Sequence, residues 1–257
     1  MTLVALDGVG KSFGGLQAVR DVSFRVQPGE IFSVIGPNGS GKSTLFNLIT
    51  GVLPPTAGTI MLFGHDVRGL GPDRIAGLGL GRTFQTTQVF AERTVLENVL
   101  AGRHLHVRTG LWGALLRTGA FREQEARHQE RSLDILAQLG LGGVVALPAG
   151  TLSNAWQQRV AIAMALATEP KLLLLDEPTG GLMEQEVLAL MELLREIRDR
   201  GVTVMLIEHK MRLVRQVSDR IAVLNNGTLI CLGTPETVLS DDRVVEAYLG
   251  TAEHAAA

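Results

Sequence analysis

Hydrophobic positions in this chain form short runs toward both ends and take a helical spacing in the middle. "VSFRV" alternates apolar and polar residues, whereas "IFSVIG", "KLLLLDE" and "VTVMLIEH" are dominated by apolar ones. Alternation predicts a half-buried strand, and a short apolar run predicts a strand covered on both faces. "IAVLNNGTLICLG" adds a hairpin that turns at Asn226 and Gly227. These segments predict an α/β core with buried strands.

The middle of the chain has a helical pattern instead. "TVLENVL" and "FREQEARHQERSLDILAQLG" have helical spacing, and the second segment ends at Gly140. Beyond "KLLLLDE", a further helix is expected to end at Gly201. We therefore predict one domain over residues 1–257, in which a helical subdomain at about 91–167 interrupts a core made of about 1–90 and 168–257.

Composition narrows the class of protein. The 257 residues are 46% hydrophobic and only 4% aromatic, and the net charge of −2 gives no basic field for nucleic acid. Cys231 is the only cysteine, so no disulfide forms within the chain and a reducing compartment is favoured. No stretch reaches the roughly 18 apolar residues that span a bilayer. Any role at a membrane would then depend on a partner.

The segment "GPNGSGKST" follows a predicted buried strand and precedes a predicted helix. It fits the pattern of a phosphate-binding loop, in which glycines let successive N–H groups surround phosphate oxygens. Lys42 would reach the β and γ phosphates of a nucleotide, and the Ser43 hydroxyl would bind Mg²⁺. The weaker alternative is a glycine turn with an incidental lysine. The predicted phosphate contacts are Gly36, Pro37, Asn38, Gly39, Ser40, Gly41, Lys42, Ser43 and Thr44.

"LLLLDE" places two carboxylates, Asp176 and Glu177, at the end of a buried strand. Ligands of open α/β sheets bind at the carboxyl ends of the strands. We expect Asp176 to hold Mg²⁺, directly or through water, and Glu177 to orient and deprotonate an attacking water. By themselves these residues could equally be a helix cap with a solvated neighbour, but the phosphate loop upstream favours the catalytic interpretation.

Three further residues have weaker signals. His209 ends "VTVMLIEH" at the same edge of the sheet as Asp176, although a histidine beside an apolar strand is more often structural. Gln85 lies at the junction into the helical segment and is, by itself, more simply a surface glutamine. Phe13 would stack on a base or pack the small β layer.

The stretch "TLSNAWQQRV" poses an open question. Ser153 precedes a predicted helix, and a helix start with a hydroxyl is suited to bind an anion. A backbone that presses against phosphate is expected to carry glycine, yet Asn154 and Ala155 follow the serine. The segment could be a working phosphate contact, a weakened contact or only a helix cap.

Taken in order, "GPNGSGKST", "RTFQ", "LSNAWQQR", "LLLLDEP" and "IEH" resemble the motifs of the ATP-binding subunits of ABC transporters, over nearly the whole chain. A second set of segments is similar to one of the two ATPases of branched-chain amino acid importers: "KSFGGLQAV", "GLGLGRTFQTTQVF" and "VVEAYLG". ATPases of importers of other solutes share these segments. The resemblance implies a P-loop NTPase (RecA-like) core with a small antiparallel β layer and an inserted α-helical subdomain.

It also implies roles and partners. Gln85 would link the Mg²⁺ site to a transmembrane permease, His209 would sense the γ-phosphate of ATP, and Phe13 would stack on adenine. ATP would lie between two ATPase chains, and a solute-binding protein would deliver the solute. The chain would be peripheral at the cytoplasmic face of the inner (plasma) membrane. "TTQVFAERTVLENVL" mixes apolar and polar residues, so we expect residues 85–90 to contact the permease.

The departures from the family pattern set the remaining expectations. The signature usually reads Leu-Ser-Gly-Gly-Gln, and here Asn154 and Ala155 replace its glycines; Met183 stands where an aspartate or asparagine is usual. We expect a weakened signature that serves the partner's ATP, and a heterodimer rather than a homodimer. The main prediction is a transport ATPase. The alternative is a regulatory half with little turnover; a small-molecule kinase is disfavoured because Glu177 is placed to activate water.

Overall fold

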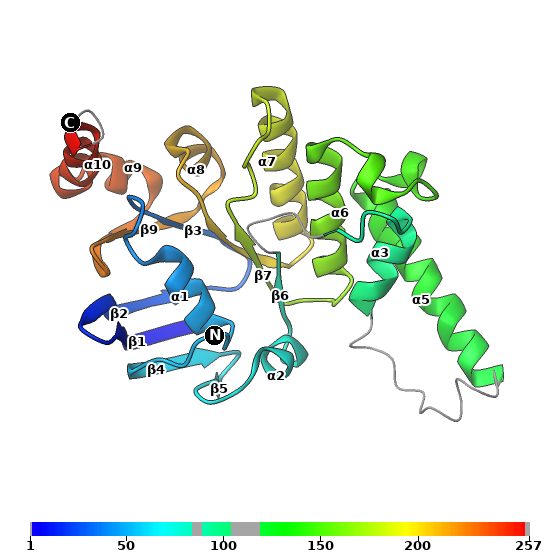
Figure 1. The fold of residues 1–257 in the computed structure, drawn as a ribbon, viewed down its shortest axis with the longest axis horizontal. Coiled ribbons are helices and arrows are strands. Elements are labelled where there is room, and N and C mark those ends of the chain that lie inside the picture. Colours follow the sequence, from blue (N-terminus) through cyan, green and yellow to red (C-terminus); the bar gives the residue numbers. More distant parts are fainter. Residues whose placement is uncertain (1, 84–88, 104–118, 255–257) are drawn as a thin grey trace. The chain divides into compact units, whose positions relative to one another are not determined.

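The computed structural model describes the backbone of residues 2–83, 89–103 and 119–254 (Figure 1). Its internal contacts divide the chain into two compact units. Unit 1 contains residues 1–80 and 171–257, and unit 2 contains residues 81–170. The predicted limits of the helical subdomain were about 91 and 167. Each unit is described in turn.

An antiparallel sheet forms one layer of unit 1. Its strand order is β2-β1-β4-β5. The strands are β1 (Val4–Phe13), β2 (Leu16–Val26), β4 (Ala57–Leu62) and β5 (His65–Asp66). The alternation in "VSFRV" is seen directly, because Val22, Phe24 and Val26 are buried while Ser23 and Arg25 are exposed.

The second sheet is mostly parallel, with the strand order β10-β9-β3-β8-β7-β6. The strands are β3 (Ile31–Ile35), β6 (Leu80–Arg82), β7 (Leu172–Asp176), β8 (Thr203–Ile207), β9 (Arg220–Asn225) and β10 (Thr228–Gly233). Every residue of β3, β7 and β8 is buried, as the apolar runs predicted. The predicted hairpin joins β9 to β10, and both Asn226 (φ 48°) and Gly227 (φ 80°) are left-handed there.

Helices flank these sheets in unit 1. They are α1 (Lys42–Ile49), α2 (Pro72–Gly77), α7 (Glu184–Asp199), α8 (Met211–Val217), α9 (Pro235–Leu239) and α10 (Asp242–His254). One apolar cluster joins α1 to both sheets, and in it the rings of Phe24 and Phe32 stack with centroids 5.1 Å apart. The chain leaves α7 through Gly201, whose φ of 92° favours glycine.

Unit 2 is mainly helical. Its helices are α3 (Val95–Gly102), α5 (Gly119–Gln138) and α6 (Asn154–Leu166), with short 3₁₀ turns η2 (Gly142–Val144) and η3 (Ala149–Thr151). Thr94 and Glu97 form a reciprocal capping box at the start of α3. Within the residues described, no helix has the length and apolar character needed to cross a bilayer.

Candidate functional site

The glycine loop connects β3 to α1, and close backbone contacts fix its two ends. A Cβ atom on Gly36 (φ 150°) would lie 2.1 Å from the Leu224 carbonyl oxygen. A Cβ atom on Gly41 (φ 101°) would lie 2.4 Å from the Ala18 carbonyl oxygen. Only glycine fits either position without a backbone shift. The loop therefore requires glycine for its shape as well as for access to phosphate.

The first turn of α1 presents donors toward the loop. Gly41 is the N-cap residue and has no side chain to cap the helix, and the first turn carries no acidic residue. The N–H groups that open a helix have no partner inside it, so this turn attracts anions. The Ser40 hydroxyl is buried, and it has no hydrogen-bond partner among the residues described. It is a further polar group that a bound phosphate could satisfy.

Lys42 is folded back onto the loop. Its Nζ donates to the carbonyl oxygens of Gly36 at 2.8 Å and Pro37 at 2.9 Å. Burial lowers the pKa of Lys42, and the negative charges of Glu177 and Asp176 partly oppose that shift. Two of its three ammonium hydrogens are therefore used by the loop, and the third is left for an anion.

The two predicted carboxylates lie at the carboxyl end of β7. Asp176 is the last residue of the strand and is only 3% exposed. Glu177 follows with a left-handed φ of 46°, and its N–H donates to the Ile207 carbonyl oxygen at 3.0 Å. His209 follows β8, the neighbouring parallel strand, and its Nδ1 lies 3.9 Å from Glu177 Oε1. The register of the sheet thus brings these residues to one edge, and the charges of Glu177 and Asp176 act on Lys42.

One residue of this edge had no role in the sequence analysis. Glu208 is fully buried; it accepts hydrogen bonds from the Thr179 N–H at 3.1 Å and the Thr179 hydroxyl at 2.6 Å. The sequence contained an indication of this role, because a glutamate directly follows the apolar run in "VTVMLIEH". A carboxylate that is buried at such a position needs hydrogen-bond donors. At that strand end the predicted site included only His209.

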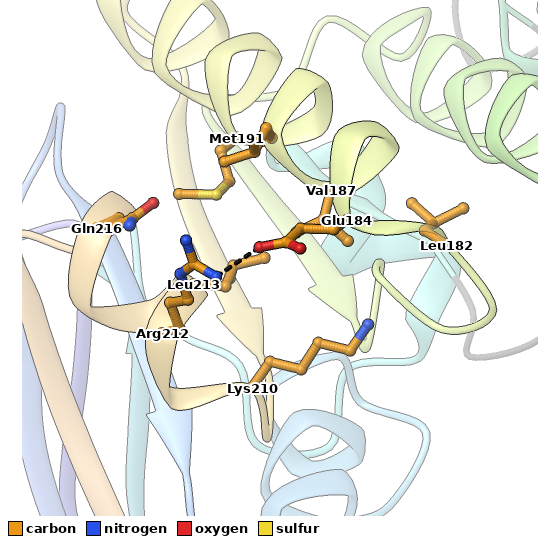
Figure 2. A pocket seen from close by; sticks show the side chains of 9 residues that line it. Leu182, Glu184, Val187, Met191, Lys210, Arg212, Leu213 and Gln216 are labelled. Carbon is orange, nitrogen blue, oxygen red and sulfur yellow. Dashed lines mark hydrogen bonds and ion pairs between the residues drawn. The ribbon is translucent and has the colours of Figure 1, made fainter.

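A hollow of about 210 Å³ lies between α7 and α8, next to these loops (Figure 2). Its lining residues are Leu182, Glu184, Val187, Leu188, Met191, Lys210, Arg212, Leu213 and Gln216. Arg212 Nη1 and Glu184 Oε1 form an ion pair of 2.5 Å across its rim. Lys210 Nζ donates to the Thr179 carbonyl oxygen at 3.1 Å, so the hollow borders the loop that follows Glu177.

The remaining predicted residues are more dispersed. Phe13 ends β1, is 46% exposed, and has the Lys11 ammonium 5.1 Å from its ring centroid. Met183 is 72% exposed and precedes α7. Gln85 lies outside the described residues.

Ser153, in unit 2, is the N-cap residue of α6. Its hydroxyl makes no capping hydrogen bond, while its carbonyl oxygen accepts the Gln157 N–H at 2.9 Å. Ser153 and Asn154 are both exposed. The first N–H groups of α6 therefore have no side-chain cap, and capping does not explain this serine.

Comparisons with known proteins agree with this geometry. Residues 19–180 match the ABC transporter family, and residues 228–254 match a branched-chain amino acid ATP-binding cassette transporter family. The chain is 43% identical to the high-affinity branched-chain amino acid transport ATP-binding protein LivG of Escherichia coli (strain K12), over 97% of this chain and 98% of that protein. It is 41% identical to the corresponding BraF of Pseudomonas aeruginosa, with the same coverage.

A solved structure of the ADP conformation of an ATP-binding cassette from an ABC transporter aligns with a TM-score of 0.86 at 34% identity, over 97% of this chain and 99% of that one. This likeness confirms the predicted P-loop NTPase fold, and the family matches confirm the resemblance inferred from the motifs. The chain belongs to the ABC transporter family, as one of its ATP-binding, ATP-hydrolysing subunits.

Proposed function

We propose that this chain hydrolyses ATP to power an importer of branched-chain amino acids or related small solutes. The main observation in favour of hydrolysis is that four predicted residues lie at one edge of the sheet: Lys42, Asp176, Glu177 and His209. The class of solute rests on the names of the relatives and on the match of residues 228–254.

Nucleotide binding follows from the loop. The N–H groups at the start of α1, the buried Ser40 hydroxyl and the Lys42 ammonium converge as donors for phosphate oxygens. The backbone N–H groups of the other predicted loop residues from Asn38 to Thr44 would complete the cradle, to which Pro37 contributes no N–H. Phe13 has an exposed ring at the end of its strand, which suits stacking on adenine.

The donor set fits Mg²⁺. Asp176 offers a nearly buried carboxylate, and Ser43 offers an exposed hydroxyl at the start of α1. In the described part of the chain no cluster of three metal-binding side chains occurs. Mg²⁺ typically uses one or two protein oxygens together with phosphates and waters, so this sparse set is appropriate. Gln85 is proposed as an additional ligand. The bound ion would neutralise developing charge on the phosphates.

In this mechanism, Glu177 orients and deprotonates the attacking water, and its side chain is 28% exposed, which leaves it accessible to solvent. His209 would contact the γ-phosphate. Because Lys42 is already next to both carboxylates, its charge lowers the cost of placing them near a polyphosphate. The regulatory alternative is not favoured, because every one of these groups is present and together.

We further propose that the chain works at the cytoplasmic face of the inner (plasma) membrane, with permease subunits, a second ATPase subunit and a solute-binding protein. Phe90 suits the permease contact. Its side chain is 57% exposed, while its backbone N–H and C=O are both bonded to the buried Asn98 side chain. An apolar side chain on a fixed backbone is a suitable interface anchor.

The proposed partner ATPase would receive the α6 start of this chain. Asn154 and Ala155 stand where glycines are usual, so the ATP site that they complete should be the weaker of two. A heterodimer with an intact partner would then retain one competent site, built on Lys42, Asp176 and Glu177 of this chain.

Glu177→Gln tests the proposal. The amide keeps the shape of the side chain but cannot accept a proton, so kcat should fall by about 10²- to 10⁴-fold while ATP still binds. Glu192→Gln is a matched control, because Glu192 is exposed and pairs only with Arg195 among the described residues. Single-turnover hydrolysis and ATP titration separate the two effects. Equal hydrolysis by wild type and Glu177→Gln would refute the assigned role.

A further inference from the structure

Glu208 lies between the two loops that carry the proposed catalytic groups. It directly follows β8 and precedes His209, and its side chain is fully buried. A buried carboxylate is costly unless hydrogen bonds compensate it. Among the residues described, no lysine, arginine or histidine side chain lies within ion-pair distance of Glu208, and its partners include hydrogen-bond donors of Thr179 and His209.

The two carboxylate oxygens serve different loops. Oε1 accepts the Thr179 N–H at 3.1 Å and the Thr179 hydroxyl at 2.6 Å, in the loop after β7. Oε2 accepts the His209 N–H at 3.2 Å, in the loop after β8. One carboxylate thus bonds to both the loop of Glu177 and the loop of His209.

The loop after β7 needs such support. Glu177 has a left-handed φ of 46°, which costs an ordinary residue energy and persists only where its surroundings hold it. Gly180 N–H closes the turn by donating to the Glu177 carbonyl oxygen at 3.1 Å. Thr179 lies inside this turn and is fully buried, so its bonds to Glu208 hold the turn from within.

Lys210 completes the arrangement from the other loop. Its Nζ donates to the Thr179 carbonyl oxygen at 3.1 Å. The N–H, hydroxyl and carbonyl groups of Thr179 are therefore all bonded to side chains that follow β8. The Glu208 carboxylate and the Lys210 ammonium therefore link the loop after β7 to the loop after β8.

We propose that Glu208 is a positioning residue that sets Glu177 relative to His209 for ATP hydrolysis, a role that rests on the proposed function. Misplacement of a catalytic group by a fraction of an ångström lowers turnover more than it lowers substrate binding. Glu208 need not touch the nucleotide for this effect.

Glu208→Gln in the full-length chain, assembled with its transporter partners, tests the proposal. The amide has one acceptor oxygen, so its NH₂ group must face the donors of one loop and release that loop. We expect kcat to fall by about ten- to a hundredfold, while the Kd for ATP changes by less than about threefold. Turnover per folded molecule and ATP titration are the readouts.

Glu30→Gln is the control for replacing a buried carboxyl group by an amide away from the two loops. Glu30 precedes β3 at the opposite end of the sheet, where it accepts bonds from the Gln27 N–H at 2.7 Å and from Arg220 at 3.3 Å. We expect this variant to change the melting temperature and to leave kcat per folded molecule unchanged. If both variants lower kcat in proportion to their loss of stability, Glu208 is only structural and the proposal fails.

Thr179 gives a second test that does not depend on the folding of Glu208→Gln. Thr179→Val removes the hydroxyl bonded to Glu208, and Thr179→Ser keeps it. The serine variant should recover most of the wild-type kcat, whereas the valine variant should resemble Glu208→Gln. Equal kcat in these two variants would overturn the proposal. If wild type itself does not hydrolyse ATP, the proposed function fails; if wild type and Glu208→Gln hydrolyse equally, only this inference fails.

Discussion

Lys42→Ala should abolish tight ATP binding without unfolding the chain. Lys42 is only 6% exposed in the wild type, and its ammonium donates two hydrogen bonds to loop carbonyls. When ATP binds, the third N–H of the ammonium and one N–H released from a loop carbonyl would donate two charge-assisted hydrogen bonds to phosphate oxygens. Each is worth about 1.5 to 3 kcal/mol, so their joint loss is about 3 to 6 kcal/mol. At about 1.4 kcal/mol per tenfold change, ATP should bind about 10²- to 10⁴-fold more weakly.

Folding should respond differently to this change. Burial lowers the pKa of Lys42, so the folded chain binds fewer protons than the unfolded chain between that lowered pKa and the ordinary value of 10.5. The free energy of unfolding therefore rises with pH across this window. Lys42→Ala should remove the contribution of Lys42 to this increase in the free energy of unfolding. The variant also removes the cost of burying a charged side chain at neutral pH.

The assay is calorimetric titration with ATP and Mg²⁺, combined with thermal unfolding at several pH values. Lys171→Ala is a suitable control, because Lys171 precedes β7 at its amino end, where its Nζ lies over the Phe63 ring at 5.5 Å. That variant should bind ATP normally. An ATP affinity of Lys42→Ala within about threefold of wild type, with both variants folded, would refute the assignment of Lys42 to phosphate.

Three further predictions test other parts of the molecule. Gly36→Ala should lower the free energy of unfolding by about 2 to 4 kcal/mol more than Gly39→Ala in urea titrations, because only the Gly36 Cβ would meet backbone. Replacing Asn154 and Ala155 together by glycine should raise the rate of ATP hydrolysis at the partner's site. If the complex keeps most of its turnover when Glu177 of this chain is replaced by glutamine, the partner's site is the more active one and the proposed asymmetry is wrong. Val89→Cys should cross-link to the permease in an active complex, and consistent failure would contradict the proposed interface.

Local sequence determined the features that depend on a few neighbouring residues. Alternation in "VSFRV" predicted which side chains of β2 are buried, and Asn226 with Gly227 predicted the hairpin turn. The glycine spacing of "GPNGSGKST" predicted the loop before α1. In each case the backbone angles or the periodic burial follow from the identity of adjacent residues. The order of the family motifs then identified the fold.

Tertiary structure decided which of these local features meet. No local pattern measures the distance between Lys42, Glu177 and His209, because they lie on segments that only the parallel register of β3, β8 and β7 brings together. The same holds for Glu208, whose buried carboxyl group accepts hydrogen bonds from Thr179 of another loop. Hydrogen bonds between loops distant in sequence depend on long-range strand pairing, which a local pattern does not encode. That pairing is the physical reason why the sequence predicted the chemical groups, while only the structure revealed that Glu208 bonds to both of the loops that carry them.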